Sequence, residues 1–205
     1  PEPIRRIIDD SENGYLSPKN AMELLRLSGI RVVESIETDK RTELLKLAGS
    51  LKYPVVQKVV GPLHKSDVGG VVVNIKDEDG LLRTFDQLMK IKGATGVLIQ
   101  PMISGTELFV GAKKEAHFPH IVLCGLGGIF VEVLKDVNAA MVPISKERAL
   151  DMIWDLKAAP ILKGVRGKKG IDINGYAENI QRISRLLELA PEISELDINP
   201  LLASG

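Results

Sequence analysis

Two hydrophobic periodicities alternate along the chain, one with the spacing of helices and one typical of strands. Apolar residues at helical spacing predict helices at about residues 18–28, 39–48, 78–91, 146–158 and 175–190. Short aliphatic runs bounded by glycine, proline and polar segments predict strands at residues 30–36, 53–60, 69–76, 95–102, 107–113, 120–124 and 195–202. The fold class that these elements predict is α+β.

The order of the elements predicts two lobes. Residues 1–15 precede the first predicted helix and are interpreted as an N-terminal arm. Residues 16–96 form the predicted N-terminal lobe and residues 97–205 the C-terminal lobe, with a hinge near residues 95–98. The chain of 205 residues contains no internal repeat or low-complexity linker, and its length suffices for two small lobes with a core each.

Composition and charge narrow the classes of partner. Lysine and arginine together number 27, as do aspartate and glutamate, so the formal net charge is zero. Because no overall field would draw the protein onto nucleic acid or an anionic membrane, we expect neither partner.

Only 4% of the residues are aromatic, which predicts aliphatic cores, and the single Cys124 in an apolar run predicts a buried thiol. No apolar run approaches the length of a membrane span and the N-terminus shows no signal-peptide pattern, so a cytoplasmic protein is expected.

A loop between two predicted strands is the first candidate for phosphate chemistry. Residues 63–71 read LHKSDVGGV. Basic, hydroxyl and glycine residues that can surround an anion follow one another there, namely His64, Lys65, Ser66, Gly69 and Gly70. Upstream, Lys58 lies within the apolar strand YPVVQKVV, where it either faces solvent at a sheet edge or meets an anionic ligand. The GxxxxGK[ST] spacing of a Walker loop is absent, so a nucleotide site here would belong to another nucleotide fold.

The second half of the chain contains a candidate hinge for a base and a set of oxygen ligands. Gln100, Pro101 and Met102 close a predicted strand, which is either an ordinary strand end or a place where backbone groups pair with a planar base. Oxygen donors occur within apolar strands at Glu107, Glu132, Asp197 and Asn199. Because Mg²⁺ prefers such ligands together with phosphate oxygens, these residues predict a magnesium–nucleotide site.

Taken in order, seven segments resemble one known family. They are YPVVQKVV, LHKSDVGGV, VLIQPM, ELFVGAK, GLGGIFVEV, GVRG and ELDINPLL. This ordered set resembles the ATP-grasp β subunit of ADP-forming acetyl-CoA synthetases and, more distantly, the β subunit of succinyl-CoA synthetase, from about residue 16 to residue 203. The resemblance implies an ATP-grasp fold, in which two α/β lobes clasp ATP or ADP. It also implies the reaction acyl-CoA + ADP + phosphate ⇌ acid + ATP + CoA.

The resemblance also implies roles for single residues. Lys58 and Lys65 would neutralise nucleotide phosphates, and the backbone of residues 100–102 would hold adenine. Glu107 would contact the nucleotide, with the ribose as the expected partner. Asn199 would ligate Mg²⁺, whereas Asp197 would either ligate it or orient an incoming phosphohistidine.

Two basic residues are associated with the transfer step. An imidazole nitrogen can carry a phosphoryl group covalently, so His64 is predicted either to relay that group or to act as a plain hydrogen-bond donor to phosphate. Arg166 lies between glycines in GVRG and matches the family pattern. It is predicted to contact phosphate or the partner, and the simpler alternative is a solvated loop.

The resemblance implies a partner and shows one departure. In the family a separate or fused α portion carries the CoA site and the main phosphohistidine. We therefore expect an α subunit, in a heterotetramer, and a chain that is incomplete as an enzyme when alone. The family pattern continues past the Asn-Pro turn into a strand whose aspartate completes the metal site. Either that strand lies beyond Gly205, or Asp197 or Glu132 takes the place of its aspartate.

Two other functions stay open on the sequence. A different ATP-grasp ligase, which joins a free acyl phosphate to an amine, would need no histidine carrier, so His64 favours the synthetase. A non-catalytic nucleotide-sensing module would not need to retain Lys58, Glu107, Asp197 and Asn199 together. The acyl group is not named by the sequence, because it is expected to bind on the partner.

Overall fold

The computed structural model describes residues 2–62, 68–116, 119–128, 135–165 and 169–204. Helices and two antiparallel sheets form the chain, which confirms the predicted α+β class. The chain divides into two compact units. One, here called the large unit, comprises residues 1–32 and 104–205, and the small unit comprises residues 33–103.

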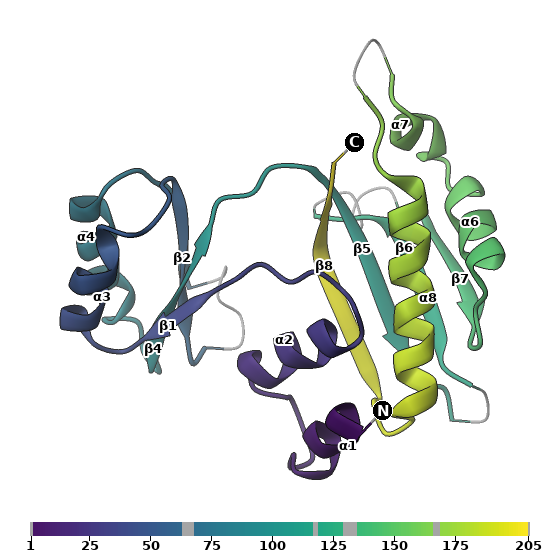
Figure 1. Cartoon of the computed structure of the whole chain (residues 1–205), viewed down its shortest axis with the longest axis horizontal. Helices are drawn as coiled ribbons and strands as arrows, with labels where there is room; N and C mark the ends of the chain where they lie inside the picture. Colours follow the sequence, from purple (N-terminus) through teal and green to yellow (C-terminus); the bar gives the residue numbers. More distant parts are fainter. Residues whose placement is uncertain (1, 63–67, 117–118, 129–134, 166–168, 205) are drawn as a thin grey trace. The chain divides into compact units, whose positions relative to one another are not determined.

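The small unit is a four-stranded antiparallel sheet with two helices on one face (Figure 1). Its elements are β1 (Ile36–Thr38), α3 (Arg41–Ala48), β2 (Val55–Val60), β3 (Val71–Ile75), α4 (Glu78–Leu88) and β4 (Gly96–Pro101). The strand order β1-β4-β2-β3 places β2 and β4 in the interior of the sheet. Leucines and Phe85 from the two helices pack against Val55, Val59, Val97 and Ile99, as the aliphatic composition predicts.

Gln57 is an exception within the core of the small unit. It lies on β2 between Val55 and Val59, on the face that the helices cover, and it is completely buried. Within the described part of the chain, neither its amide nitrogen nor its amide oxygen has a hydrogen-bond partner. A buried amide without partners costs free energy because its hydrogen bonds to water are lost on folding.

We expect Gln57→Met to raise the free energy of unfolding by about 1–3 kcal/mol, since the thioether has similar volume and no bond to lose. Urea denaturation monitored by circular dichroism measures the change. Gln87→Met is the matched control, because Gln87 is exposed on α4 and should leave stability unchanged. A loss of stability in Gln57→Met would mean that the amide has a partner, such as a buried water.

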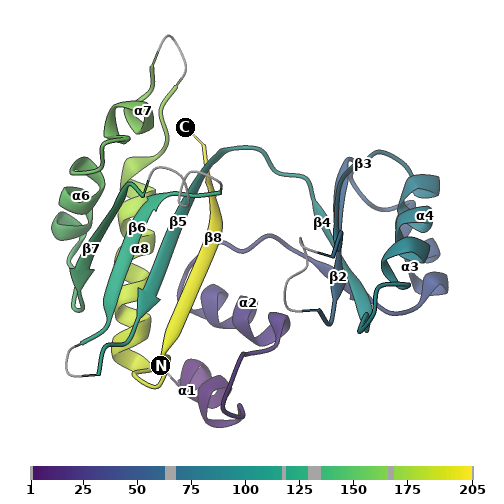
Figure 2. The same cartoon turned by 180° about the vertical axis from the view of Figure 1, so that it is seen from behind.

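The large unit is a second four-stranded antiparallel sheet, of order β7-β6-β5-β8. Its elements are α1 (Glu2–Asp9), α2 (Pro18–Leu27), β5 (Thr106–Lys113), β6 (Ile121–Leu126), β7 (Val137–Met141), α6 (Lys146–Trp154), α7 (Ala159–Lys163), α8 (Ile173–Leu189) and β8 (Glu195–Ala203). Helices α6 and α8 cover one face of the sheet, whereas α1 and α2 lie beside the edge strand β8 (Figures 1 and 2). None of the helices that the structure describes is long and apolar enough to span a bilayer.

The N-terminal region differs from its prediction. Residues 1–15 are predicted as an arm, but they contain α1, whose Ile4 is buried in the core of the large unit. A strand is predicted at residues 30–36, yet Ile30 is also buried in that core and β1 begins only at Ile36. The units therefore divide after residue 32 and after residue 103, rather than after residue 96.

The first helix is held by an ion pair to the segment after α8. Arg5 contacts the Glu192 carboxylate at 2.8 Å and the Asp9 carboxylate at 2.6 Å. The hydrogen bond from Arg5 is the main reason that the pKa of Glu192 falls to about 2. The interaction is at the surface, so it contributes locally to the position of α1 rather than to the stability of the whole unit.

A pH dependence follows from this pair. The pKa of Glu192 is lower in the folded state than its ordinary value of 4.5. The stabilisation of α1 by the Arg5–Glu192 pair is therefore complete above pH 4.5 and is lost as the pH falls towards about 2. We expect Glu192→Gln to accelerate amide hydrogen exchange in α1 at pH 7, and the difference from wild type to vanish near pH 2. Glu188→Gln, at an exposed position of α8, is the control. Unchanged exchange in α1 at pH 7 would contradict the anchoring role.

Candidate functional site

One face of the large sheet carries the predicted oxygen ligands. On β5, Leu108, Val110 and Ala112 point into the core under the helices, so alternation directs Glu107 to the opposite face. On β8, Leu196 and Ile198 pack on the same core, so Asp197 and Asn199 also belong to the opposite face. Figure 2 shows the sheet from this opposite side.

Glu107 and Asn199 meet at a glycine turn after β6. The Gly127 N–H donates to the Glu107 carbonyl at 2.8 Å, and the Gly128 N–H donates to Asn199 Oδ1 at 3.0 Å. Gly128 has a φ of 61°, and a Cβ there would collide with the Glu107 carboxylate. A Cβ at Gly127 would collide with the Leu108 carbonyl. Only glycines let this backbone approach both side chains, so they account for the glycine-rich GLGG run, to which the sequence analysis assigned no role.

Asn199 reaches this turn because β8 contains a bulge. The register moves from the Leu108–Leu201 pair directly to the Val110–Ile198 pair, so Asn199 and Pro200 together lie opposite Phe109. The sequence predicts that the strand ends in a turn at Pro200, but β8 continues to Ala203. The prediction that the strand ends at Pro200 is therefore wrong. A bulge in β8 accommodates the proline, and this bulge redirects the neighbouring side chain.

Asp197 lies on the same face as Asn199, opposite Gly111 of β5. Its carboxylate stays exposed, but partial desolvation, followed by the nearby charge of Glu195, raises its pKa above the ordinary value. A raised pKa means that this carboxylate takes up a proton at a higher pH than an ordinary aspartate. The structure thus places Asp197 beside Asn199 along β8 without bringing it to the glycine turn.

A buried tyrosine holds the strands from the helix side. Tyr176 of α8 donates its hydroxyl hydrogen to the Phe109 carbonyl at 2.7 Å and accepts from the Gly125 N–H at 3.0 Å. Phe109 and Gly125 are partners in the β5–β6 register, so the hydroxyl bridges the two strands two residues from Glu107 and Gly127. Burial raises the pKa of Tyr176 well above its ordinary value, so it remains a neutral donor. The sequence gives no signal for this residue, because only the fold reveals its partners.

Cys124 is a buried thiol, as the sequence predicts. Burial raises its pKa to about 12, so the thiol stays protonated at neutral pH. It belongs to the core of the large unit rather than to the candidate site.

In the small unit, Lys58 faces away from the helices. It occupies an interior strand, which excludes the alternative of an edge residue, and it is half-buried. Gln100 pairs with Val56 on β4 and is 8% exposed, on the same side of the sheet as Lys58. This face therefore carries a cationic and an amide side chain, together with Glu37 of β1, which pairs with Leu98 from the side opposite to Lys58.

The predicted base-binding hinge has backbone that is paired on one side. The β1–β4 ladder ends at the Ile36–Ile99 pair, whereas Gln100 and Pro101 still pair with β2. The Met102 N–H donates to the Pro54 carbonyl at 3.1 Å, so this donor is already used. In the described ladders, residues 100–102 have no pairing partner on the β1 side.

Part of the predicted phosphate loop is described. Gly70 accepts from the Val59 N–H at 2.7 Å and leads into β3, and Gly69 has a φ of 66°. Both glycines are therefore next to the strand that carries Lys58. The remaining predicted site residues lie outside the described residues, namely His64, Lys65, Ser66, Glu132 and Arg166.

The oxygen ligands of this face form a small set. In the described part of the chain, no three His, Cys, Asp or Glu side chains are grouped as metal ligands. Glu107 and Asn199 nevertheless present a carboxylate and an amide oxygen to one glycine turn. Two protein oxygens suit Mg²⁺ that is bound mainly through substrate phosphates and water, so the residues present fit such an ion.

Comparison with known proteins identifies a family model and close relatives. The model of the ATP-grasp domain matches residues 8–205. The β subunit of acetate–CoA ligase [ADP-forming] I from Pyrococcus furiosus is 42% identical over 97% of this chain and 91% of that subunit. Acetate–CoA ligase [ADP-forming] I from Archaeoglobus fulgidus is 37% identical over 98% of this chain, which spans only 30% of that longer protein.

Solved structures agree with this relationship. Acetyl-coenzyme A synthetase 1 from Candidatus Korarchaeum cryptofilum, in complex with coenzyme A and Ca-AMPCP, superposes with a TM-score of 0.88 at 32% identity, over 97% of this chain and 92% of that chain. A second complex of that synthetase contains coenzyme A and Mg-AMPPCP, with its phosphohistidine segment pointing towards the nucleotide site. It gives a TM-score of 0.81 at 30% identity, over 98% of this chain and 91% of that chain.

Proposed function

Because this chain belongs to the ATP-grasp family and is related to the β subunits of ADP-forming acetate–CoA ligases, we propose that it is the nucleotide-binding subunit of an ADP-forming acyl-CoA synthetase. The reaction is acyl-CoA + ADP + phosphate ⇌ acid + ATP + CoA, with acetyl-CoA as the first substrate to test. The observation that carries the proposal is the convergence of Glu107 and Asn199 on the Gly127–Gly128 turn. That turn brings two oxygen ligands to a place where backbone N–H groups are already ordered.

In the large unit, Asn199 and Glu107 would hold Mg²⁺ and the nucleotide. Asn199 Oδ1 accepts one hydrogen bond from Gly128, which orients the amide and leaves a second lone pair for a cation. The bound ion would supply charge neutralisation for phosphate oxygens. Glu107 would contact the ribose or the ion from the neighbouring strand.

In the small unit, Lys58 would neutralise phosphate, and the Gln100–Met102 backbone would hold adenine. Lys58 is half-buried on the face opposite to the helices, where a charge-assisted bond is stronger than in water. The backbone of residues 100–102 beyond the end of the β1 ladder is suited to a planar base. Gly69 and Gly70, with Lys65 and Ser66, would surround the phosphates.

His64 would receive the phosphoryl group and pass it between the partner's phosphohistidine and the nucleotide. Its imidazole nitrogen would form the N–P bond as the bond to the donor breaks, and would then release the group to ADP. Asp197 would orient the incoming histidine, and Arg166 would contact phosphate or the partner. Glu132 remains a proposed additional ligand of the ion.

The partner would be an α subunit that carries the CoA site. The Pyrococcus relative is named a β subunit, and the Archaeoglobus relative is a single longer chain, which supports a second portion outside this one. We propose a heterotetramer located in the cytoplasm.

The test is ADP-dependent release of CoA from acetyl-CoA, measured as free thiol, with and without a co-expressed α subunit. We expect release only when both polypeptides are present, and nucleotide binding by this chain alone. Robust release of CoA by this chain alone would refute the subunit assignment. Nucleotide binding without release under any combination would favour the sensing module.

A further inference from the structure

Three parts of the proposed nucleotide site meet at one residue of β5, Phe109. Glu107 lies two positions before it on the same face of the sheet. From β6, Gly125 pairs with Phe109, and the glycine turn begins two positions later at Gly127. From β8, the bulge that carries Asn199 lies opposite Phe109. A displacement of Phe109 would therefore reach the carboxylate, the turn and the amide together.

The hydroxyl of Tyr176 enters the sheet at this residue. In an antiparallel ladder, the N–H and C=O groups of partner residues face each other at every second pair. The bond from the Gly127 N–H to the Glu107 carbonyl marks such a pair, so the Phe109–Gly125 pair is the next one. The hydroxyl accepts from the Gly125 N–H at 3.0 Å and donates to the Phe109 carbonyl at 2.7 Å, with the Gly125 carbonyl at 3.1 Å. It therefore uses groups that the two strands would otherwise share, and their separation depends on it.

The side chain of Phe109 is held on the opposite face. A Cβ at Gly111 would lie 3.0 Å from the Phe109 ring, and a Cβ at Gly125 would lie 3.3 Å from it. The ring thus covers both glycines on the face that carries Glu107, and Phe109 is only 8% exposed. Its carbonyl is fixed from the helix side and its ring from the other side, so this part of β5 has little freedom to move.

Tyr176 acts from a distance. It is 2% exposed and belongs to the core under the helices, whereas Glu107 lies on the other face of the sheet, so its hydroxyl does not contact a nucleotide bound there. Because burial raises its pKa well above the ordinary value, the hydroxyl keeps its proton and its bond to the Phe109 carbonyl at any working pH.

We propose that the Tyr176 hydroxyl is a positioning group for phosphoryl transfer, which sets the separation of β5 and β6 and thereby aligns Glu107 with the glycine turn and Asn199. The inference rests on the proposed function. Without the oxygen atom, the Gly125 N–H and the Phe109 carbonyl would move together or lose their bonds, and either change displaces the site. A small displacement affects the transition state more than the binding of nucleotide, because the reacting groups must be aligned closely.

Tyr176→Phe removes this one oxygen atom, and Ser184→Ala is the matched control. Ser184 is also completely buried on α8, and its hydroxyl accepts from the backbone N–H of Ile144, away from the site. Both variants should lower the midpoint of thermal denaturation by about 3–6 °C, since each loses a buried hydrogen bond. CoA release is then assayed with the α partner, at a temperature where all proteins are folded.

We expect Tyr176→Phe to reduce kcat about tenfold, with KM for ADP within about twofold of wild type, and Ser184→Ala to retain both values. A purely structural hydroxyl would lower stability and leave kcat unchanged. Wild-type kcat in Tyr176→Phe, or an equal loss in Ser184→Ala, would therefore overturn the inference.

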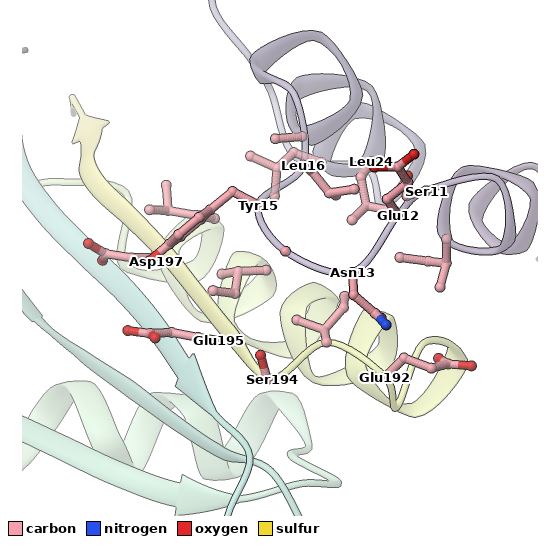
Figure 3. A pocket seen from close by; sticks show the side chains of 17 residues that line it. Ser11, Glu12, Asn13, Tyr15, Leu16, Leu24, Glu192, Ser194, Glu195 and Asp197 are labelled. Carbon is pink, nitrogen blue, oxygen red and sulfur yellow. The ribbon is translucent and has the colours of Figure 1, made fainter. Parts of the chain in front are cut away.

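A measurement on the wild-type chain does not depend on the folding of a variant. The Tyr176 hydroxyl proton should be protected from exchange and give its own NMR resonance, which should shift on saturation with Mg-ADP together with the Gly127 and Gly128 amides. The Ser194 amide is the reference and should not shift, because Ser194 lines a separate pocket between the N-terminal segment and β8 (Figure 3).

The outcomes separate the two proposals. Binding of Mg-ADP without a shift of the hydroxyl resonance, or a hydroxyl proton that exchanges too fast to be observed, would overturn the positioning role and leave the proposed function in place. A wild-type chain that does not bind Mg-ADP would refute the nucleotide site, and the positioning role with it.

Discussion

We expect Gly128→Ala to reduce CoA release, assayed with the α partner, by about 10²-fold, because a displaced site residue loses its alignment with the nucleotide. A methyl group at this position would collide with the Glu107 carboxylate. Either the Glu107 side chain moves, or the turn moves and breaks the bond from the Gly128 N–H to Asn199. The Mg²⁺-dependent part of ADP binding should weaken in parallel, which isothermal calorimetry with and without Mg²⁺ measures.

Gly93→Ala separates this effect from backbone strain. Gly93 has a φ of 84° and open space where a Cβ would lie, so its alanine variant experiences the left-handed penalty of about 1 kcal/mol without a collision. Both variants should therefore carry the backbone penalty, to which Gly128→Ala adds the collision, and only Gly128→Ala should lose activity. Equal activity in the two variants would show that the glycine turn is no part of the nucleotide site.

Most helices and strands could be predicted because their signals are local. The strand YPVVQKVV and the helix with Phe85 and Leu88 show their periodicity within a few residues, and both occur in the structure. The strand β7, VNAAM, was not predicted because its alternation is weak and only pairing with β6 makes it a strand. The short helix α7 likewise carries too few periodic positions to be detected.

The lobe boundaries depended on contacts that periodicity does not contain. When the chain is read in order, Ile4 falls in the predicted arm, and Leu24 and Ile30 fall in the predicted N-terminal lobe. In the structure they are buried with residues from the second half of the chain. A non-local contact of this kind is set by tertiary packing and leaves no mark on local spacing.

The candidate site was predicted as separate residues but not as an arrangement. Glu107 and Asn199 are 92 positions apart, and their meeting depends on the register of β5 with β8 and on the bulge at Asn199–Pro200. The glycine turn between them is recognisable in the sequence as a glycine-rich run. The need for glycine there follows only from the structure, in which a Cβ would collide with the Leu108 carbonyl or the Glu107 carboxylate. The resemblance to a known family named the ligands, whereas the structure explains why glycine must stand beside them.

His64 is the proposed carrier of the phosphoryl group. If it carries the phosphoryl group, the protein incubated with γ-labelled ATP, Mg²⁺ and the α partner should acquire a label that is acid-labile and alkali-stable, as expected of an N–P bond. His64→Asn retains a polar side chain of similar reach but removes the nucleophile. We expect this variant to lose labelling at His64 and to reduce CoA release by at least about 10³-fold, while Mg-ADP affinity stays nearly unchanged.

Lys58→Ala gives the contrasting control. Loss of a charge-assisted bond to phosphate should weaken nucleotide binding by roughly 1.5–3 kcal/mol, so binding and turnover should fall together.

Site-resolved mass spectrometry under alkaline conditions distinguishes a label on this chain from one on the partner. Turnover of His64→Asn within a few-fold of wild type would show that the phosphoryl group reaches the nucleotide without this histidine, and would leave His64 as a hydrogen-bond donor of the phosphate loop.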